Sequence, residues 1–230
     1  MKISLMVIAK DELKPSKVII PKINLGKFNQ ICLIDGHSTD GTDNYYRRLG
    51  FEIYRQKIKG LGGAVFEARK RCKTDAFAIF HPDGNEDYKE LYKFKKIFEN
   101  GADLIIPSRM VKGSFNEEDS QILKPRKWFN QGLALIANVL WGTKKHKITD
   151  PTQGLRAITT KAYDKLKLDM SNLTIDYQMV IRALKKKINI VEYPTKEGKR
   201  LFGTTNFKSI PTGIAELKML YREILIGDGF

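Results

Sequence analysis

The sequence predicts an α/β fold with a doubly wound, mostly parallel central sheet flanked by helices. Short apolar runs alternate with segments of helical periodicity through the first half of the chain, which is the pattern of strand–helix–strand units. Several of these runs stop abruptly at polar residues, as strands do when their carboxyl ends border a ligand crevice. The 230 residues, 42% of them hydrophobic, suffice for one large domain, alone or with a small appendage.

The first half contains short expected strands with helices between them. The strands are the apolar runs at residues 3–9, 30–34, 51–55, 76–80 and 103–107. A loop at 38–42 leads into one helix, and the glycines at 60–63 open another at 64–73. Apolar residues recur at helical spacing in the first of these helices, at Tyr45, Tyr46 and Leu49. The same spacing at Leu91, Phe94, Ile97 and Phe98 predicts a further helix between the last two strands.

The second half is less regular. Residues 112–124 are polar and are expected to form a loop, and 128–141 has the pattern of an amphipathic helix. The remaining expected elements are a polar turn at 149–157 that leads into a short strand, a helix at 175–186 and a strand at 188–193.

An apolar stripe follows Pro211. Its residues recur at three- and four-residue intervals, at Ile214, Leu217, Leu220, Tyr221, Ile224 and Leu225. The helix that this stripe predicts faces the core or a partner, or it lies in a membrane interface. We therefore expect a domain at 1–208 and a C-terminal amphipathic helix at 209–230. The longest apolar run, 132–141, is about half of the roughly 20 residues that a membrane span needs, so no span is expected.

The chain carries a net charge of +15, from 41 Lys and Arg against 26 Asp and Glu. Such an excess favours anionic partners, namely nucleotide diphosphates, acidic lipid headgroups or nucleic acid. The basic residues are dispersed, without a basic tail or an aromatic platform, which argues against nucleic acid. Cys32 and Cys72 provide neither a disulfide framework nor a metal-binding spacing, and this predicts a reducing, cytoplasmic compartment.

The most informative motif is His81-Pro82-Asp83-Gly84-Asn85, which follows the apolar run 76–80. An Asp followed two residues later by an Asn offers hard oxygen ligands, which suit Mg²⁺ or Mn²⁺ carrying a diphosphate. The same residue types also favour an ordinary turn. Asp35 ends another strand, so both carboxylates are expected at one edge of the sheet. Neither a nucleophile elbow nor a His-x-x-x-His pair is present, which leaves carboxylates, arginines and a metal to carry the chemistry.

Taken in order, these segments resemble the GT-A glycosyltransferases of glycosyltransferase family 2, closest to the dolichyl- or polyprenyl-phosphate sugar (mannose or glucose) synthases. The resemblance extends over about residues 3–208 and lies in the segments 34–42, 60–64, 81–85, 107–113, 150–157 and 192–205. It implies a GT-A fold that binds a nucleotide diphosphate sugar.

The chain departs from the family pattern at three positions. His81 stands where the family has the first Asp of its metal motif, Gly36 replaces an Asp of the base-binding element, and Asn85 replaces a Gln. The resemblance implies that Asp83 and Asn85 are metal ligands. His81 either ligates the metal through its imidazole, orients a water molecule or fills space.

The reaction that the resemblance implies is inverting and metal-dependent. A sugar moves from a GDP- or UDP-sugar to an acceptor, and arginines clamp the diphosphate; the family positions are Arg109, Arg126 and Arg200. A polyprenyl phosphate acceptor is already anionic at neutral pH and needs no base. A glycan hydroxyl acceptor needs one, and Asp150 is then the candidate. Arg156 is expected to brace the Asp150 loop.

The resemblance also implies a donor-binding set. Its members are Ala9, Asp11, Glu12, Asp35, His37, Gly62, Asp83, Gly84, Arg109 and Arg200. We expect a cytoplasmic enzyme that is peripheral on the inner face of the membrane. The alternatives are a soluble family 2 enzyme that acts on a cell-surface glycan hydroxyl, a sugar nucleotidyltransferase, which normally has a Gly-rich loop that Ala9-Lys10-Asp11-Glu12 lacks, and a non-catalytic nucleotide-sugar-binding relative.

Overall fold

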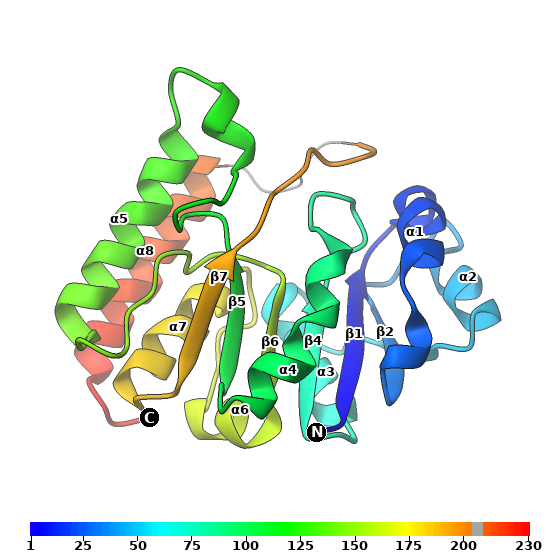
Figure 1. Cartoon of the computed structure of the whole chain (residues 1–230), viewed down its shortest axis with the longest axis horizontal. Coiled ribbons are helices and arrows are strands. Elements are labelled where there is room, and N and C mark those ends of the chain that lie inside the picture. The colour runs from blue at the N-terminus through cyan, green and yellow to red at the C-terminus, as the bar shows by residue number, and fades with distance from the viewer. Residues whose placement is uncertain (204–208) are drawn as a thin grey trace.

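The computed structural model describes residues 1–203 and 209–230, and its centre is one seven-stranded sheet in the order β3-β2-β1-β4-β6-β5-β7 with helices on both faces (Figure 1). The strands are β1 (Ile3–Ala9), β2 (Gln30–Asp35), β3 (Glu52–Arg55), β4 (Ala76–Phe80), β5 (Leu104–Ser108), β6 (Arg156–Thr159) and β7 (Ile190–Pro194). β6 runs antiparallel to β4 and β5, and the other strand pairs are parallel. The predicted mostly parallel α/β sheet is confirmed.

Most of the helices agree with the prediction, and two short ones were not predicted. They are α1 (Leu13–Ile19), α2 (Thr42–Arg48), α3 (Leu61–Arg71), α4 (Phe94–Glu99), α5 (Pro125–Trp141), α6 (Thr160–Leu166), α7 (Ile175–Lys185) and α8 (Ser209–Ile226). The sequence did not predict α1, which contains Pro15 in its first turn, or α6, which follows β6 without an intervening loop. The expected loop at 112–124 contains a short 3₁₀ helix, Glu117–Ser120.

Two of the predicted helices begin three residues earlier than expected. α5 starts at Pro125, whose fixed φ and missing N–H suit the first turn of a helix. α3 starts at Leu61 and includes Gly62 and Gly63. A side chain at Gly62 would overlap the carbonyl of Met170, so this glycine is required for the close packing of two backbones.

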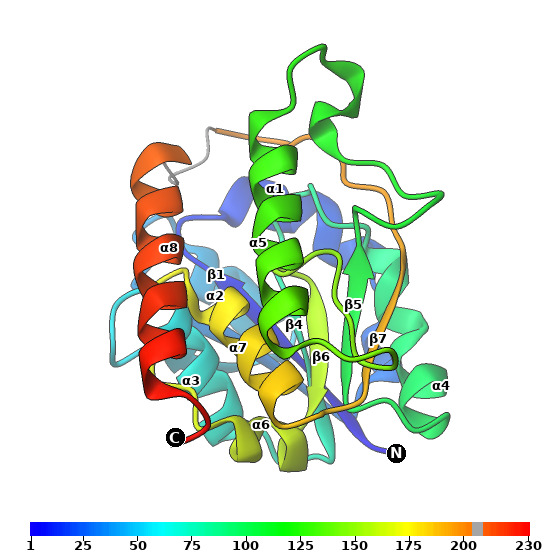
Figure 2. The same ribbon diagram turned by 90° about the vertical axis from the view of Figure 1, so that its left-hand side faces the viewer.

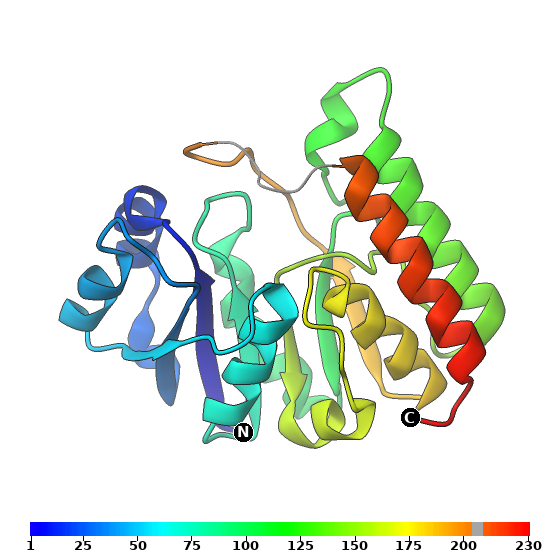
Figure 3. The ribbon, with the colours of Figure 1, turned by 180° about the vertical axis from the view of Figure 1, so that it is seen from behind.

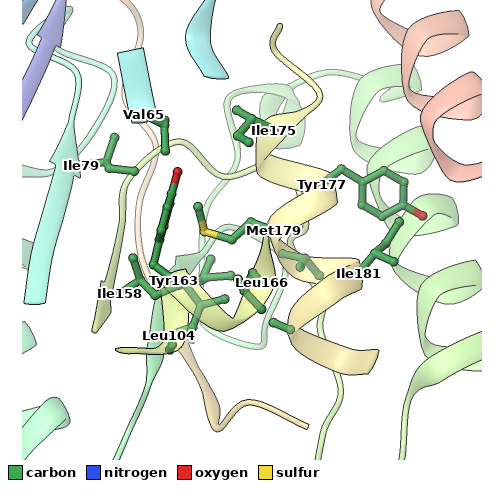
Figure 4. Packing of buried hydrophobic residues seen from close by; sticks show 14 of the residues in the cluster. Val65, Ile79, Leu104, Ile158, Tyr163, Leu166, Ile175, Tyr177, Met179 and Ile181 are labelled. Carbon is green, nitrogen blue, oxygen red and sulfur yellow. The ribbon is translucent and has the colours of Figure 1, made fainter. Parts of the chain in front are cut away.

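The two faces of the sheet bury separate apolar layers. Alternate residues of β1 point to opposite sides, with Met6 and Ile8 in one layer and Leu5 and Val7 in the other. The first layer lies under α3, α5, α6, α7 and α8, and Figure 4 shows part of it around Met179. The second lies under α1, α2 and α4.

The C-terminal helix α8 packs against α7 through buried ion pairs. Glu223 of α8 is completely buried and accepts hydrogen bonds from Gln178 (2.9 Å), Arg182 (3.0 Å) and Lys185 (3.1 Å). Figure 3 shows α8 lying along the outside of the domain. The expected boundary at residue 208 lies outside the described residues, as do Thr204 and Thr205 of the last segment of the resemblance. Among the described residues, no helix has the length and apolar character that a bilayer crossing requires.

Candidate active site

The site lies where the chain order of the sheet reverses. β1 pairs with β2 on one side and with β4 on the other, and open α/β sheets bind ligands outside the carboxyl ends of the strands at such a point. The loops after β1 and β4 border this crevice and carry Glu12 and Asp83. Residues 196–201, which follow β7, cross the same edge of the sheet, and we call this segment the strap (Figure 1).

Arg200 of the strap joins the two loops. Its guanidinium donates to Asp83 Oδ2 at 3.0 Å and also pairs with Glu12. Burial raises the pKa of Glu12 even though Arg200 is adjacent. Residues far apart in the sequence therefore meet at one point, and a positive charge lies against the carboxylate of Asp83.

The strap also lies directly on the loop that contains Asp83. The amide of Leu201 donates to the carbonyl of Asp83 at 3.0 Å, and the amide of Gly198 donates to the carbonyl of Asn85 at 2.8 Å. The side chain of Leu201 occupies the space beside Gly84, whose φ of +92° also disfavours any other residue. Gly84 is therefore required by the strap contact as well as by the turn.

Asn85 carries an acceptor that the protein leaves unsatisfied. Its Oδ1 is buried and finds no hydrogen-bond partner among the residues that the structure describes, which is rare for a buried oxygen. Together with the carboxylate of Asp83 it offers two hard oxygen donors, which fits Mg²⁺ or Mn²⁺ that also binds phosphate oxygens. Within 1–203 and 209–230, no three His, Cys, Asp or Glu side chains gather into a metal-binding group.

His81 is engaged by a residue that the sequence analysis did not single out. Its Nδ1 lies 2.9 Å from Glu86 Oε1, and its backbone amide donates to Glu86 Oε2 at 2.9 Å. Burial alone lowers the pKa of His81, but the Glu86 carboxylate outweighs it and raises the pKa to about 9. A Cβ at Gly154 would stand 3.1 Å from the ring. His81 is thus part of a packed ion pair beside Asp83.

Arg109 lies in a second, denser cluster. Its Nε donates to Asp150 Oδ2 at 2.8 Å, and its terminal nitrogens donate to Asp150 Oδ1 and to Glu197 Oε1, each at 2.8 Å. Asn130 donates to Asp150 Oδ1 at 2.7 Å. Asp150 is completely buried; burial would raise its pKa, but Arg109 holds the pKa below its usual range. Sequence reasoning missed Glu197 and Asn130, which become neighbours only in the fold.

Two charged side chains, those of Glu192 and Arg156, brace the Asp150 loop through its backbone. Glu192 accepts from the amides of Thr149 (2.7 Å) and Asp150 (3.0 Å), and burial raises its pKa to about 7. Arg156 is buried and donates to the carbonyls of Pro151 and Gln153. The expected bracing role of Arg156 is confirmed.

Arg126 lies apart from both clusters. It belongs to the first turn of α5, its side chain is 52% exposed, and it pairs with Glu117 (2.7 Å) and Glu118 (3.1 Å). The structure does not bring it to Asp83 or Arg200 among the described contacts.

The loops after β1 and β2 hold most of their carboxylates in local contacts. Asp35 is buried and accepts from the amide of Ser38 at 3.1 Å, and Asp11 accepts from the amide of Thr39 at 2.7 Å. His37 has a φ of +65° and its Nε2 lies 3.0 Å from the carbonyl of Gln56. Ala9, the last residue of β1, pairs with Asp35 across the sheet. Gly62 faces the 170–172 loop rather than the crevice.

Gly36, the second departure from the family pattern, has a steric cause. A Cβ at this position would stand 2.8 Å from Cβ of Lys10 and 3.3 Å from its Cγ, which is closer than real contacts allow. The stem of Lys10 therefore fills the space that a side chain at position 36 would need.

Comparison with known proteins agrees with this geometry. The sequence model of the glycosyl transferase family 2 matches residues 23–167. The chain is 26% identical over 230 residues to the dolichol-phosphate mannosyltransferase of Pyrococcus furiosus, covering 96% of this chain and 63% of that protein. It is 26% identical over 208 residues to the dolichyl-phosphate hexose transferase of Haloferax volcanii, covering 90% and 85%. The chain thus spans less than two thirds of the first of these relatives.

Solved structures share the fold. Glucosyl-3-phosphoglycerate synthase from Mycobacterium tuberculosis, in complex with uridine diphosphate, superposes with a TM-score of 0.71 at 14% identity, covering 96% of this chain and 79% of that one. The same enzyme with Mn²⁺, uridine diphosphate and phosphoglyceric acid gives a TM-score of 0.64 at 16% identity, covering 97% and 76%. The predicted GT-A fold is confirmed.

Proposed function

The chain belongs to glycosyltransferase family 2, and from that premise we propose that it transfers a sugar, with inversion, from a nucleotide diphosphate sugar to a polyprenyl phosphate with the help of a divalent cation. One observation carries the proposal: at the reversal point of the sheet Asp83 pairs with the guanidinium of Arg200, and Asn85, two residues further along the same loop, has a buried oxygen that no described residue satisfies. Anionic and cationic groups at one crevice suit a metal and a diphosphate together.

Asp83 and Asn85 are the proposed metal-binding residues. A cation held there would neutralise charge that develops on the departing diphosphate. The neighbouring structures of glucosyl-3-phosphoglycerate synthase were obtained with Mn²⁺ or Mg²⁺ and uridine diphosphate, which supports the choice of ion. His81, which is hydrogen-bonded to Glu86, helps to orient the loop that carries Asp83 and Asn85.

Arg200 is the proposed diphosphate clamp. Its side chain is 26% exposed and it already spans the crevice from Glu12 to Asp83, so it can exchange these carboxylates for phosphate oxygens. Arg109 has a different role. Because its N–H groups are directed to Asp150 and Glu197, it holds the Asp150 loop against the strap.

The polyprenyl phosphate acceptor is supported by chemistry and by the named relatives. Both are dolichol- or dolichyl-phosphate transferases. A phosphate monoester has a second pKa of about 6 and attacks without a base. The alternative acceptor, a glycan hydroxyl, needs a carboxylate base, and Asp150 is buried and saturated with donors. We place the enzyme in the cytoplasm, peripheral on the inner face of the membrane.

The test combines donors, metal and acceptors. The protein is incubated with GDP- and UDP-sugars and polyprenyl phosphate, with Mg²⁺, Mn²⁺ or a chelator, and lipid-linked sugar is measured. Binding of Mn²⁺ in the presence of nucleotide diphosphate is measured separately by electron paramagnetic resonance. We expect metal-dependent product, and weaker Mn²⁺ binding in Asp83→Ala. Transfer only to a glycan hydroxyl would overturn the acceptor, and nucleotide-sugar binding without any transfer would indicate a non-catalytic relative.

A further inference from the structure

Two helices on the outside of the domain each present a stripe of apolar side chains to solvent. α5 and α8 lie side by side on the outside of the domain (Figures 2 and 3), and Gly213 of α8 packs against the ring of Phe129 of α5. The exposed apolar residues of this pair, which we call the α5/α8 face, are Trp128, Phe129, Leu135, Ile136, Val139, Leu140, Ile210, Ile214, Leu217, Tyr221, Ile224 and Leu225. Monomeric proteins rarely leave so many large apolar side chains together in water.

The charges on these helices have one sign. The sequence of α5 contains no Asp or Glu. α8 contains two, Glu216 and Glu223, and both are buried, with 2% and 0% exposure. The charged side chains of the two helices that are not buried are basic. Arg126, Lys127 and Arg222 pair with Glu117, Asp119 and Asp169 of neighbouring segments, and Lys218 is exposed. Since the two helices themselves expose no carboxylate and the chain carries a net charge of +15, this apolar surface suits an anionic lipid surface.

A loop extends this surface beyond the start of α5. Ile122 is 96% exposed and Leu123 is 68% exposed, and Figure 1 shows their segment rising above the amino end of α5. The amino ends of α5 and α8 lie at the same end of the molecule as the carboxyl ends of the strands, where the site is (Figure 1). A membrane that binds the α5/α8 face would therefore also lie near the crevice.

The α5/α8 face is fixed to the domain. Glu223 is bonded to Gln178, Arg182 and Lys185 of α7, and separating α8 would leave these buried charges without partners. The helix is therefore not free to swing away, and its exposed side keeps one orientation relative to the site.

We propose that the α5/α8 face docks on an anionic lipid bilayer, with both helices lying in the interface and the Ile122–Leu123 loop inserted beside them. The docking rests on the proposed function in one respect: it brings the crevice to an acceptor phosphate that is held in the membrane. The sequence pattern indicated only the stripe on α8. Its joining with α5 and the loop is a property of the fold.

The first experiment measures vesicle binding alone. The protein is sedimented with vesicles of phosphatidylcholine or of phosphatidylcholine and phosphatidylglycerol. We expect binding to the anionic vesicles, and at least a tenfold weaker partition for the double variant Val139→Glu, Leu225→Glu, whose positions are 74% and 69% exposed. Ile58→Glu, at a 51% exposed apolar position away from the two helices, is the matched control and is expected to bind like the unchanged protein.

A second pair of variants protects the test from a folding artefact. Leu135→Glu with Ile214→Glu changes the same face at other exposed positions and is expected to give the same loss, with circular dichroism spectra unchanged. Equal vesicle binding by all variants would overturn the proposal. So would a dimer in solution that the double variants dissociate while vesicle binding stays absent, since a second copy would then cover the face.

Transfer assays separate this proposal from the proposed function. A short prenyl phosphate that is soluble in water is compared with a long polyprenyl phosphate embedded in anionic vesicles. The double variants are expected to keep turnover on the soluble acceptor and to lose at least tenfold on the embedded one. If no acceptor is used by any form of the protein, the proposed function fails, while the sedimentation result still decides the docking.

Discussion

Arg200 and Arg109 each bridge two carboxylates, but their surroundings differ. Arg200, whose side chain is 26% exposed, joins Glu12 and Asp83 of two different loops, and the oxygen of Asn85 in the second loop has no partner among the described residues. Arg109 lies against a completely buried Asp150 that Asn130 also satisfies. The sequence predicted the same clamping role for both. The comparison teaches that the residue type alone does not identify a ligand-binding group. A donor or acceptor whose hydrogen bonds are not all satisfied within the protein is the better candidate.

The largest expected effect tests whether the Arg109 cluster is scaffold. Asp150→Ala would remove the fully buried carboxylate that is the main partner of the partly buried guanidinium of Arg109, and breaking a buried pair costs about 3–5 kcal/mol. We expect a loss of that order in the free energy of unfolding, measured by urea denaturation. Asp150→Asn, which retains the shape, is expected to lose less. A stable Asp150→Ala protein that fails only in turnover would instead make Asp150 a direct participant in the reaction.

Asp83→Ala tests the opposite region. Its carboxylate is 14% exposed and contacts Arg200, which keeps Glu12 as a second partner, so the loss in the free energy of unfolding is expected to be smaller than for Asp150→Ala, about 1–3 kcal/mol. Turnover is expected to fall about 100- to 1,000-fold, the usual cost of losing one group that stabilises developing charge. Asp87→Asn, in the same loop, is the matched control because Asn retains the oxygen that accepts from the amide of Lys89. Unchanged turnover in Asp83→Ala would refute the metal assignment.

The sequence predicted the scaffold of these regions better than their partners. Apolar runs such as 76–80 and the polar residues that follow them located the strands and the crevice, because burial and turn chemistry are local properties. Glu86, Asn130 and Glu197 were missed because their roles depend on which loops meet in space. Gly36 looked like a lost carboxylate, and only the position of the Lys10 side chain explains it.

A buried carboxyl group in the scaffold predicts how stability depends on pH. Glu216 is 2% exposed, its Oε2 has no partner within the part of the chain that the structure describes, and burial raises its pKa to about 8. A carboxyl whose pKa is raised on folding stabilises the fold below its unfolded pKa, and that contribution is lost as pH rises through the folded value. We expect the free energy of unfolding to fall between pH 4.5 and about 8, by an amount on the order of 4 kcal/mol.

Glu216→Gln is expected to flatten this dependence, since the amide does not ionise. The measurement is urea denaturation at pH 5, 6.5 and 8, with the unchanged protein as reference. A parallel decline in both proteins would assign the pH dependence to Glu192, whose pKa is raised to about 7 beneath the Asp150 loop.

The smallest expected effect concerns Arg126, which belongs to neither region. It is 52% exposed and pairs with Glu117 and Glu118 at the start of α5, and exposed pairs of this kind contribute about 0–1 kcal/mol. Arg126→Ala is therefore expected to leave the free energy of unfolding nearly unchanged. Because Arg126 borders the α5/α8 face, we expect a severalfold higher KM for polyprenyl phosphate in anionic vesicles and an unchanged KM for the nucleotide sugar. A rise in the nucleotide-sugar KM instead would place Arg126 with Arg200 at the diphosphate.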